Sequence, residues 1–95
     1  MANLIELAAE VGRTLQQRGL MLATAESCTG GGVAQAITEI AGSSEWFECG
    51  FVTYSNEAKM AMLKVPEETL ARHGAVSYET AQAMAQGAIC LLYTS

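Results

Sequence analysis

Two adjacent side chains, Ser27 and Cys28, are candidate nucleophiles at a glycine-rich turn. The apolar run 20–25 before them is typical of a short buried strand, and apolar residues recur at helical spacing over 29–41. A strand therefore meets a helix at this turn. We expect unpaired backbone N–H groups at the start of that helix to favour an anion. Because a hydroxyl is a weak nucleophile, serine chemistry here requires a base.

Lys59 is the candidate base for Ser27. It follows a second predicted strand, 46–54, and open α/β sheets place their sites at the carboxyl ends of strands. If the two strands are parallel neighbours, Ser27 and Lys59 reach the same edge of the sheet. A lysine desolvated in such a cleft can have its pKa lowered toward neutrality and accept the serine proton. Spacing alone leaves open the alternative of a solvated lysine and a serine that caps a helix.

The other chemical candidates have structural explanations. His73 precedes Gly74 at a predicted helix end, where histidine is commonly a cap or a surface residue. Cys28, if not a nucleophile, is expected to be a buried small hydrophobe. The glycines at 30–32 are a weak phosphate-loop signal, and they also permit close backbone approach.

Composition limits the function classes. The 95 residues make one domain at most, and a hydrophobic content of 51% indicates a folded chain. Five basic against ten acidic residues, without a basic cluster, argue against nucleic-acid binding. There is no run of membrane-spanning length and no signal-peptide pattern, so we expect a cytoplasmic protein without membrane association. Three scattered cysteines and one histidine predict reduced thiols and no metal site.

The predicted element order is α-β-α-β-α-α-α, which favours an α/β layered domain, although two strands are few for five helices. Caps are expected at Asn3, Asn56 and Ser77, and Gly19 is expected to end the first helix. Pro66 is expected at the first position of the helix 66–72. The predicted strand 46–54 places alternate residues on one face, namely Phe47, Cys49, Phe51 and Thr53.

Residues 90–95 differ from the rest of the chain. The helical pattern up to residue 89 gives way to Cys-Leu-Leu-Tyr-Thr-Ser, a sequence that one frame of a common transposase sequencing adapter encodes. We interpret 90–95 as a non-native tail and 1–89 as the domain. Codons unlike the adapter would contradict this interpretation.

Four ordered motif blocks are similar to one family. The chain resembles the CinA C-terminal domain family, which includes nicotinamide mononucleotide deamidases, over nearly residues 4–88. The blocks are Ala25-Glu26-Ser27-Cys28-Thr29-Gly30-Gly31, Gly42-Ser43-Ser44, Val52-Thr53-Tyr54-Ser55-Asn56-Glu57-Ala58-Lys59, and Gly74-Ala75-Val76-Ser77 with its continuation to Gly87.

The resemblance implies hydrolysis of the carboxamide of nicotinamide mononucleotide to nicotinate mononucleotide and ammonia, without metal or cofactor. Ser27 would attack, Lys59 would accept and return its proton, and Tyr54 would orient or relay it. The resemblance also implies that the amides of Thr29, Gly30 and Gly31 hold the oxyanion. Cys28 and Asn56 complete the expected substrate-binding set. The substrate is a small molecule, and a homo-oligomer is left open.

The fold implied by the resemblance is a three-layer α/β/α sandwich around a mixed sheet, of which this chain supplies the N-terminal part. The family continues into further strands that complete the substrate pocket, so we expect this chain to be inactive and marginally folded. The alternatives are a non-catalytic nucleotide-binding or regulatory domain and, from composition alone, an interaction fragment that uses its amphipathic helices. The presence of both Ser27 and Lys59 favours the enzyme.

Overall fold

Two parallel strands, β1 (Leu22–Glu26) and β2 (Phe47–Val52), form the centre of the fold. The structure is a computed structural model and describes residues 3–94. In the register of the pair, Leu22 lies opposite Phe47 and Glu26 lies opposite Val52. The remaining elements are the helices α1 (Leu4–Gln17), α2 (Gly32–Thr38), α3 (Asn56–Leu63), α4 (Glu67–His73) and α5 (Tyr78–Thr94), and a 3₁₀ turn, η1 (Ser43–Glu45).

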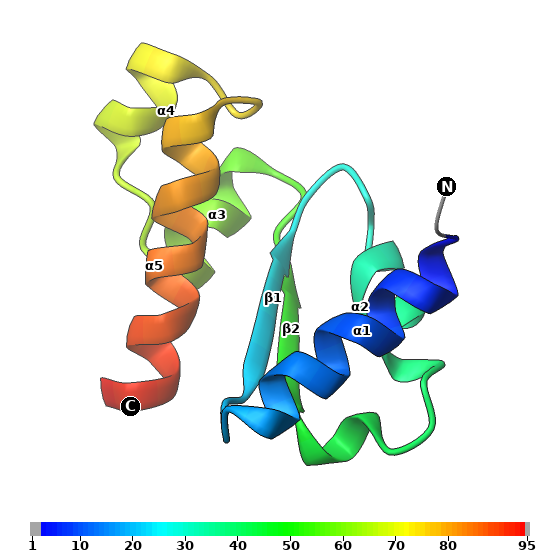
Figure 1. The fold of residues 1–95 in the computed structure, drawn as a ribbon. Coiled ribbons are helices and arrows are strands. Elements are labelled where there is room, and N and C mark those ends of the chain that lie inside the picture. The colour runs from blue at the N-terminus through cyan, green and yellow to red at the C-terminus, as the bar shows by residue number, and fades with distance from the viewer. Residues whose placement is uncertain (1–2, 95) are drawn as a thin grey trace.

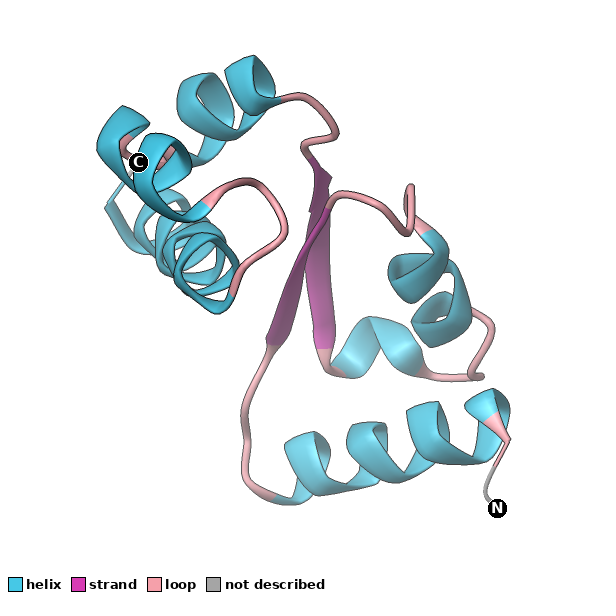
Figure 2. Cartoon of the chain, turned by 90° about the horizontal axis from the view of Figure 1, so that it is seen from above, coloured by secondary structure: helices cyan, strands magenta, loops and turns pink. Residues whose placement is uncertain are grey.

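Helices lie on both sides of the strand pair. One side carries α1 and α2, and the other carries α3, α4 and α5 (Figure 1). The view from above shows the two strands between these groups of helices (Figure 2). This arrangement confirms the predicted α/β class and its layering. Because both described strands are parallel, the mixed character of the sheet stays a prediction.

The larger core lies between the strands and α3, α4 and α5. Its buried members are packed by Ala25 of β1 and Phe51 of β2. Gly87 of α5 is part of this packing, because a Cβ at that position would collide with the carbonyl of Leu63. The buried cluster itself consists of Leu63, Val65, Leu70, Met84 and Ala88.

On the other side of the sheet, α1 packs through small residues. Ala8 is buried, and the indole of Trp46, 2% exposed, lies where a Cβ of Gly12 would be. Asn3 caps α1 as predicted, because its side chain accepts the N–H of Glu6 at 2.8 Å. The sequence thus predicted both the helix and its start.

The prediction of a helix over 29–41 was wrong in its bounds. Gly30 and Gly31 have φ of 62° and 103°, in the left-handed region, so the helical conformation begins only at Gly32. At its other end α2 stops at Thr38, and Ile40 donates to the carbonyl of Ile37 in a tighter turn. The helix is therefore short.

Two predicted helix starts also need correction. Ser55, not Asn56, caps α3: its side chain accepts the N–H of Ala58 at 3.0 Å, and Asn56 is the first helical residue. Pro66 occupies the cap position of α4 rather than its first turn. In both helices the cap is the residue with extended backbone, Ser55 or Pro66, and the helix begins at the next residue.

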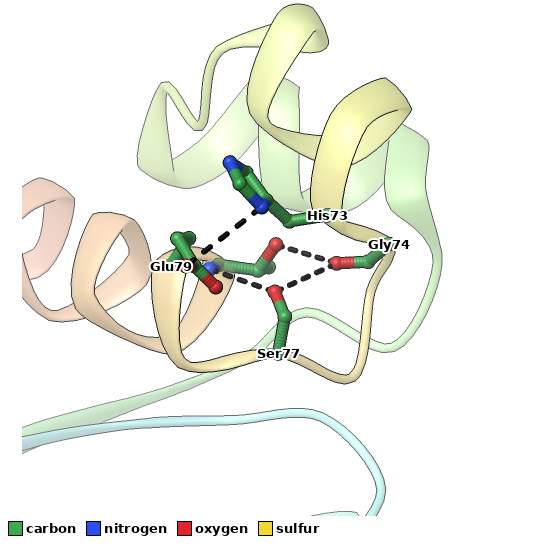
Figure 3. A network of polar contacts seen from close by, with 5 residues as sticks. His73, Gly74, Ser77 and Glu79 are labelled. Atoms are coloured by element: carbon green, nitrogen blue, oxygen red, sulfur yellow. Dashed lines mark hydrogen bonds and ion pairs between the residues drawn. The ribbon is translucent and has the colours of Figure 1, made fainter.

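The start of α5 is held by a local polar network (Figure 3). Ser77 accepts the N–H of Thr80 at 3.1 Å, which confirms Ser77 as the cap, and both hydroxyls donate to the carbonyl of Gly74. His73 Nδ1 lies 3.7 Å from Glu79 Oε2. His73 therefore has the structural role that its position at a helix end predicted.

The predicted tail continues α5, which runs to Thr94, while Ser95 lies outside the described residues. The foreign origin of 90–95 stays a prediction that the nucleotide sequence would test. Over residues 3–94, no helix is long and apolar enough to cross a membrane. The same residues contain no cluster of three or more histidines, cysteines or carboxylates suited to a metal ion.

Candidate active site

The parallel pairing of β1 and β2 brings Ser27 and Tyr54 together where both strands end. Beyond the last strand residues, Thr53 donates its N–H to the carbonyl of Glu26 at 2.9 Å and so extends the ladder. Ser27 then donates its hydroxyl to the carbonyl of Tyr54 at 3.3 Å. The site lies at the carboxyl ends of the strands, as the sequence predicted.

Lys59 joins this pair from α3. The cap at Ser55 starts the helix directly after Tyr54 and places Lys59 in its first turn, where the side chain is 1% exposed. Its Nζ donates to Ser27 Oγ at 3.0 Å and to the Tyr54 carbonyl at 3.0 Å. The predicted meeting of Ser27 and Lys59 is confirmed, and the alternative of a solvated lysine is wrong.

The polar partners of Lys59 are neutral oxygens. The two ion pairs found among residues 3–94, Arg72 with Glu68 and His73 with Glu79, lie on α4 and α5. Neither includes Lys59. A buried amine beside a hydroxyl is the arrangement needed for proton exchange between the two groups.

Glu26, the residue before Ser27, is a feature that sequence reasoning missed. It is 5% exposed, and its carboxylate accepts hydrogen bonds from the turn and from the start of α2. The donors are the Thr29 hydroxyl at 2.6 Å and the N–H groups of Gly31 at 3.2 Å, Val33 at 2.9 Å and Ala34 at 2.9 Å.

These contacts set the charge of Glu26. Burial raises the pKa of its carboxyl, but the hydrogen bonds from Thr29, Val33, Ala34 and Gly31 outweigh burial, and the net pKa is lowered. The expectation that the start of α2 offers unpaired N–H groups to an external anion was therefore wrong. The anion at this helix terminus is Glu26 itself. An acidic residue shortly before a glycine-rich helix start is the sequence signal that could have indicated this role.

Some backbone N–H groups of the turn already donate a hydrogen bond within the protein, and others are free to donate to an oxyanion. Gly30 donates to the Ser27 carbonyl at 3.0 Å, and Gly31 donates to Glu26, so two of the three amides expected to hold an oxyanion already have acceptors. The amides of Cys28 and Thr29 have no acceptor among residues 3–94. Cys28 is exposed rather than buried, contrary to its expected role as a hydrophobe.

The remaining predicted residues lie close by in different ways. Tyr54 contacts Ser27 and Lys59 through its carbonyl, and its side chain is 73% exposed. Asn56 is exposed at the start of α3. The roles of the Tyr54 side chain, Cys28, Thr29 and Asn56 toward a substrate stay predictions.

A separate apolar groove of about 660 Å³ runs between β1 and α5. Ala25, Ala85 and Ala88 are among the residues that line it, whereas Ser27 and Lys59 are not. The polar site therefore lies outside this groove.

Fold and site together define an α/β domain with a serine–lysine pair at the carboxyl ends of parallel strands. The family model of the CinA C-terminal domain matches residues 4–94, and the chain belongs to this family.

Relatives and solved structures agree with the family assignment. The chain is 60% identical over 88 residues to the nicotinamide-nucleotide amidohydrolase PncC of Escherichia coli K12, covering 93% of this chain and 53% of that protein. It is 63% identical over 79 residues, 83% of this chain, to a CinA-like protein of Chloroherpeton thalassium, of which it covers 19%. The crystal structure of a competence/damage-inducible protein from Agrobacterium tumefaciens superposes with a TM-score of 0.87 at 53% identity, covering 94% of this chain and 54% of that one. The chain thus spans about half the length of the amidohydrolase it matches.

Proposed function

We propose that this chain carries the nucleophile and base of an amidohydrolase that converts nicotinamide mononucleotide to nicotinate mononucleotide and ammonia. The observation that supports this most directly is the 3.0 Å contact between Nζ of the buried Lys59 and Ser27 Oγ, where the two strands end. The name of the Escherichia coli relative supports a nicotinamide nucleotide as the substrate. The substrate is a small molecule, and the cytoplasm is the location that the sequence predicts.

The proposed reaction has two halves. Ser27 Oγ attacks the carboxamide carbon while Lys59 Nζ, acting as the base, takes the hydroxyl proton. The C–N bond then breaks, and Lys59 gives its proton to the leaving nitrogen, which departs as ammonia. In the second half Lys59 takes a proton from water, the hydroxide attacks the acyl-serine ester, and the proton returns to Ser27 as the carboxylic acid leaves.

The oxyanion of each tetrahedral intermediate requires donors next to Ser27. The amides of Cys28 and Thr29 lie in the turn without internal acceptors, so we assign this role to them in place of Gly30 and Gly31. A donor of this kind contributes roughly a hundred- to a thousandfold in rate. The Tyr54 carbonyl accepts hydrogen bonds from both Ser27 and Lys59 and so positions the two side chains relative to each other before attack.

The test uses a chimera in which this chain replaces the matching segment of the Escherichia coli relative, so that the remaining half is supplied. Ammonia release from nicotinamide mononucleotide is measured for Ser27→Ala and Lys59→Met. Each substitution is expected to lower kcat by at least about a hundredfold. Lys64→Met, which removes an exposed lysine five residues later, is the matched control and is expected to retain turnover.

A non-catalytic nucleotide-binding or regulatory domain is the second candidate. The Chloroherpeton thalassium relative supports it, because the match covers 19% of that protein and the domain is there part of a longer chain. A binding domain would show altered affinity and no dependence of turnover on Ser27. Retained turnover in Ser27→Ala would therefore contradict the serine mechanism.

A further inference from the structure

Glu26 and Ser27 are consecutive residues whose side chains reach opposite sides of the sheet. The Glu26 carboxylate contacts α2, whereas the Ser27 hydroxyl contacts Lys59 of α3. Glu26 is the last residue of β1 and Ser27 is the first residue beyond it. Consecutive side chains along a strand point to opposite faces, and the two contacts follow this division. Whatever fixes Glu26 also fixes the backbone from which Ser27 projects.

The carboxylate ties both ends of the turn. Oε1 accepts from Thr29 and Gly31, within the turn, and from Val33 in the first turn of α2. Oε2 accepts from Ala34. Hydrogen bonds to an ionised acceptor are roughly twice as strong as those between neutral groups. Four such donors on one buried carboxylate connect the turn to the start of α2.

The conformation of the turn depends on an internal acceptor of this kind. Gly30 and Gly31 both have backbone in the left-handed region. A Cβ added at either position would have no neighbouring atom nearer than 3.6 Å, so tight packing does not hold these residues in place. The Glu26 carboxylate and the bond from Gly30 to the Ser27 carbonyl are the contacts that do.

We propose that Glu26 is a positioning residue for the serine–lysine pair. Its carboxylate locks the turn of residues 28–31, which holds Ser27 against Lys59 and directs the amides of Cys28 and Thr29 away from internal acceptors. The inference rests on the proposed function, because it assigns Glu26 a part in the same reaction. Glu26 does not touch the substrate.

The test is Glu26→Gln in the chimera described above. The amide NH₂ of glutamine turns a donor toward the N–H groups that the carboxylate accepts, so at least one donor loses its partner. A displaced nucleophile costs on the order of a hundredfold, and we expect kcat to fall about ten- to a hundredfold. KM is expected to change by less than about threefold, because ground-state binding is not removed.

A second variant and a stability control separate positioning from general destabilisation. Thr29→Val removes one of the four donors and is expected to lower kcat in the same direction by a smaller factor. Leu70→Val weakens the core of α4 and α5 and is expected to lower the unfolding midpoint while leaving kcat unchanged below it. In the 95-residue chain, Glu26→Gln is expected to speed amide hydrogen exchange at Gly31, Val33 and Ala34.

Three outcomes overturn the inference. Glu26→Gln with wild-type kcat does so while leaving the serine mechanism in place, provided that Ser27→Ala is inactive. The inference is also overturned if Glu26→Gln lowers kcat no more than Leu70→Val does when the two variants are equally stable. Glu26 would then affect folding alone. Wild-type turnover by Ser27→Ala overturns both the inference and the proposed function.

Discussion

Lys59 is the residue whose environment most needs a functional explanation. A lysine that is 1% exposed, with a hydroxyl and a carbonyl as hydrogen-bond partners, is costly to bury. A hydrophobic residue at this position of α3 would pack without that cost. The buried amine is explained if its task is to exchange a proton with Ser27.

Lys59→Arg tests whether the proton or the charge matters. Arginine carries a permanent positive charge and does not lose its proton in proteins, so it cannot act as a base. We expect ammonia release by the chimera to fall about a hundred- to ten-thousandfold. Circular dichroism checks that the larger side chain is accommodated. Turnover near the wild-type rate in a folded Lys59→Arg variant would mean that Lys59 serves as a cation and not as a base.

Glu26 predicts a pH dependence of stability. Its pKa is lowered in the folded chain, with burial opposed and outweighed by the four hydrogen bonds. The stabilisation is therefore complete above the pKa of the unfolded chain and is lost as pH falls through the lower pKa of the folded chain. Glu26→Gln is expected to lower the free energy of unfolding by about 1–3 kcal/mol at neutral pH.

Urea unfolding of both chains at a series of pH values measures this difference, and contributions from the other carboxyls cancel in the comparison. The difference between wild type and Glu26→Gln should shrink as the pH becomes acidic. A difference that is constant down to the most acidic pH would contradict the assignment of these hydrogen bonds to an ionised carboxylate.

Sequence order made Ser27 and Lys59 candidate partners, because both follow strands and parallel neighbours bring such positions together. It left open the alternative of a solvated lysine, which the buried contact between the two side chains excludes. The role of Glu26 could not be predicted in the same way. It depends on left-handed backbone at Gly30 and Gly31, which curls the start of α2 around the carboxylate. No periodicity in the sequence encodes that turn.

At the scale of elements, the position of α3 depends on its packing against α5. The two helices approach so closely at Gly87 that a methyl group there would meet the carbonyl of Leu63. Leu63 ends the helix that carries Lys59. The small size of Gly87 in α5 therefore allows α3 to lie where it places Lys59, the candidate base.

Gly87→Ala is expected to destabilise the chain by about 1–3 kcal/mol through overpacking, although alanine is the better helix former by about 1 kcal/mol. Thermal or urea unfolding measures the change. Gly32→Ala is the matched control, because a Cβ at that helical position meets nothing within 4 Å. If Gly87→Ala were as stable as Gly32→Ala, the close contact of α3 and α5 would be contradicted.

The sequence predicted the type and order of every α-helix and strand described in residues 3–94, and its errors fall at their ends. Ser55 rather than Asn56 caps α3. Both residue types are good helix caps, so the sequence alone does not show which of the two has the extended backbone that a cap requires. The end of β1 reaches Glu26, one residue beyond its apolar run, because the ladder with β2 continues there. Such bounds depend on partners in space.

For the whole molecule, the central feature is a sheet of two strands, each paired with the other alone within residues 3–94. Both outer edges carry backbone groups without ladder partners. The groove between β1 and α5 and several exposed apolar residues of α1, such as Leu4 and Leu7, add apolar surface. The chain covers only 53% of its Escherichia coli relative.

We therefore expect the 95-residue chain alone to release no ammonia from nicotinamide mononucleotide and to unfold at lower urea concentration than the chimera. Two open sheet edges and uncovered apolar surface are the physical reasons. Ammonia release and urea unfolding of the two proteins, measured side by side, check both expectations. Turnover by the chain alone at the rate of the chimera would show that residues 1–95 are sufficient for the site.

The most direct test of the central claim is the detection of the acyl-serine. The chimera is mixed with nicotinamide mononucleotide, quenched in acid during turnover and digested with trypsin, which cuts after Arg18 and Lys59. The predicted result is a fragment of residues 19–59 that carries the acyl group of the nucleotide on Ser27, with no adduct in Ser27→Ala. An acyl adduct on Cys28, or an acyl adduct on the same fragment of the Ser27→Ala variant, would contradict the account.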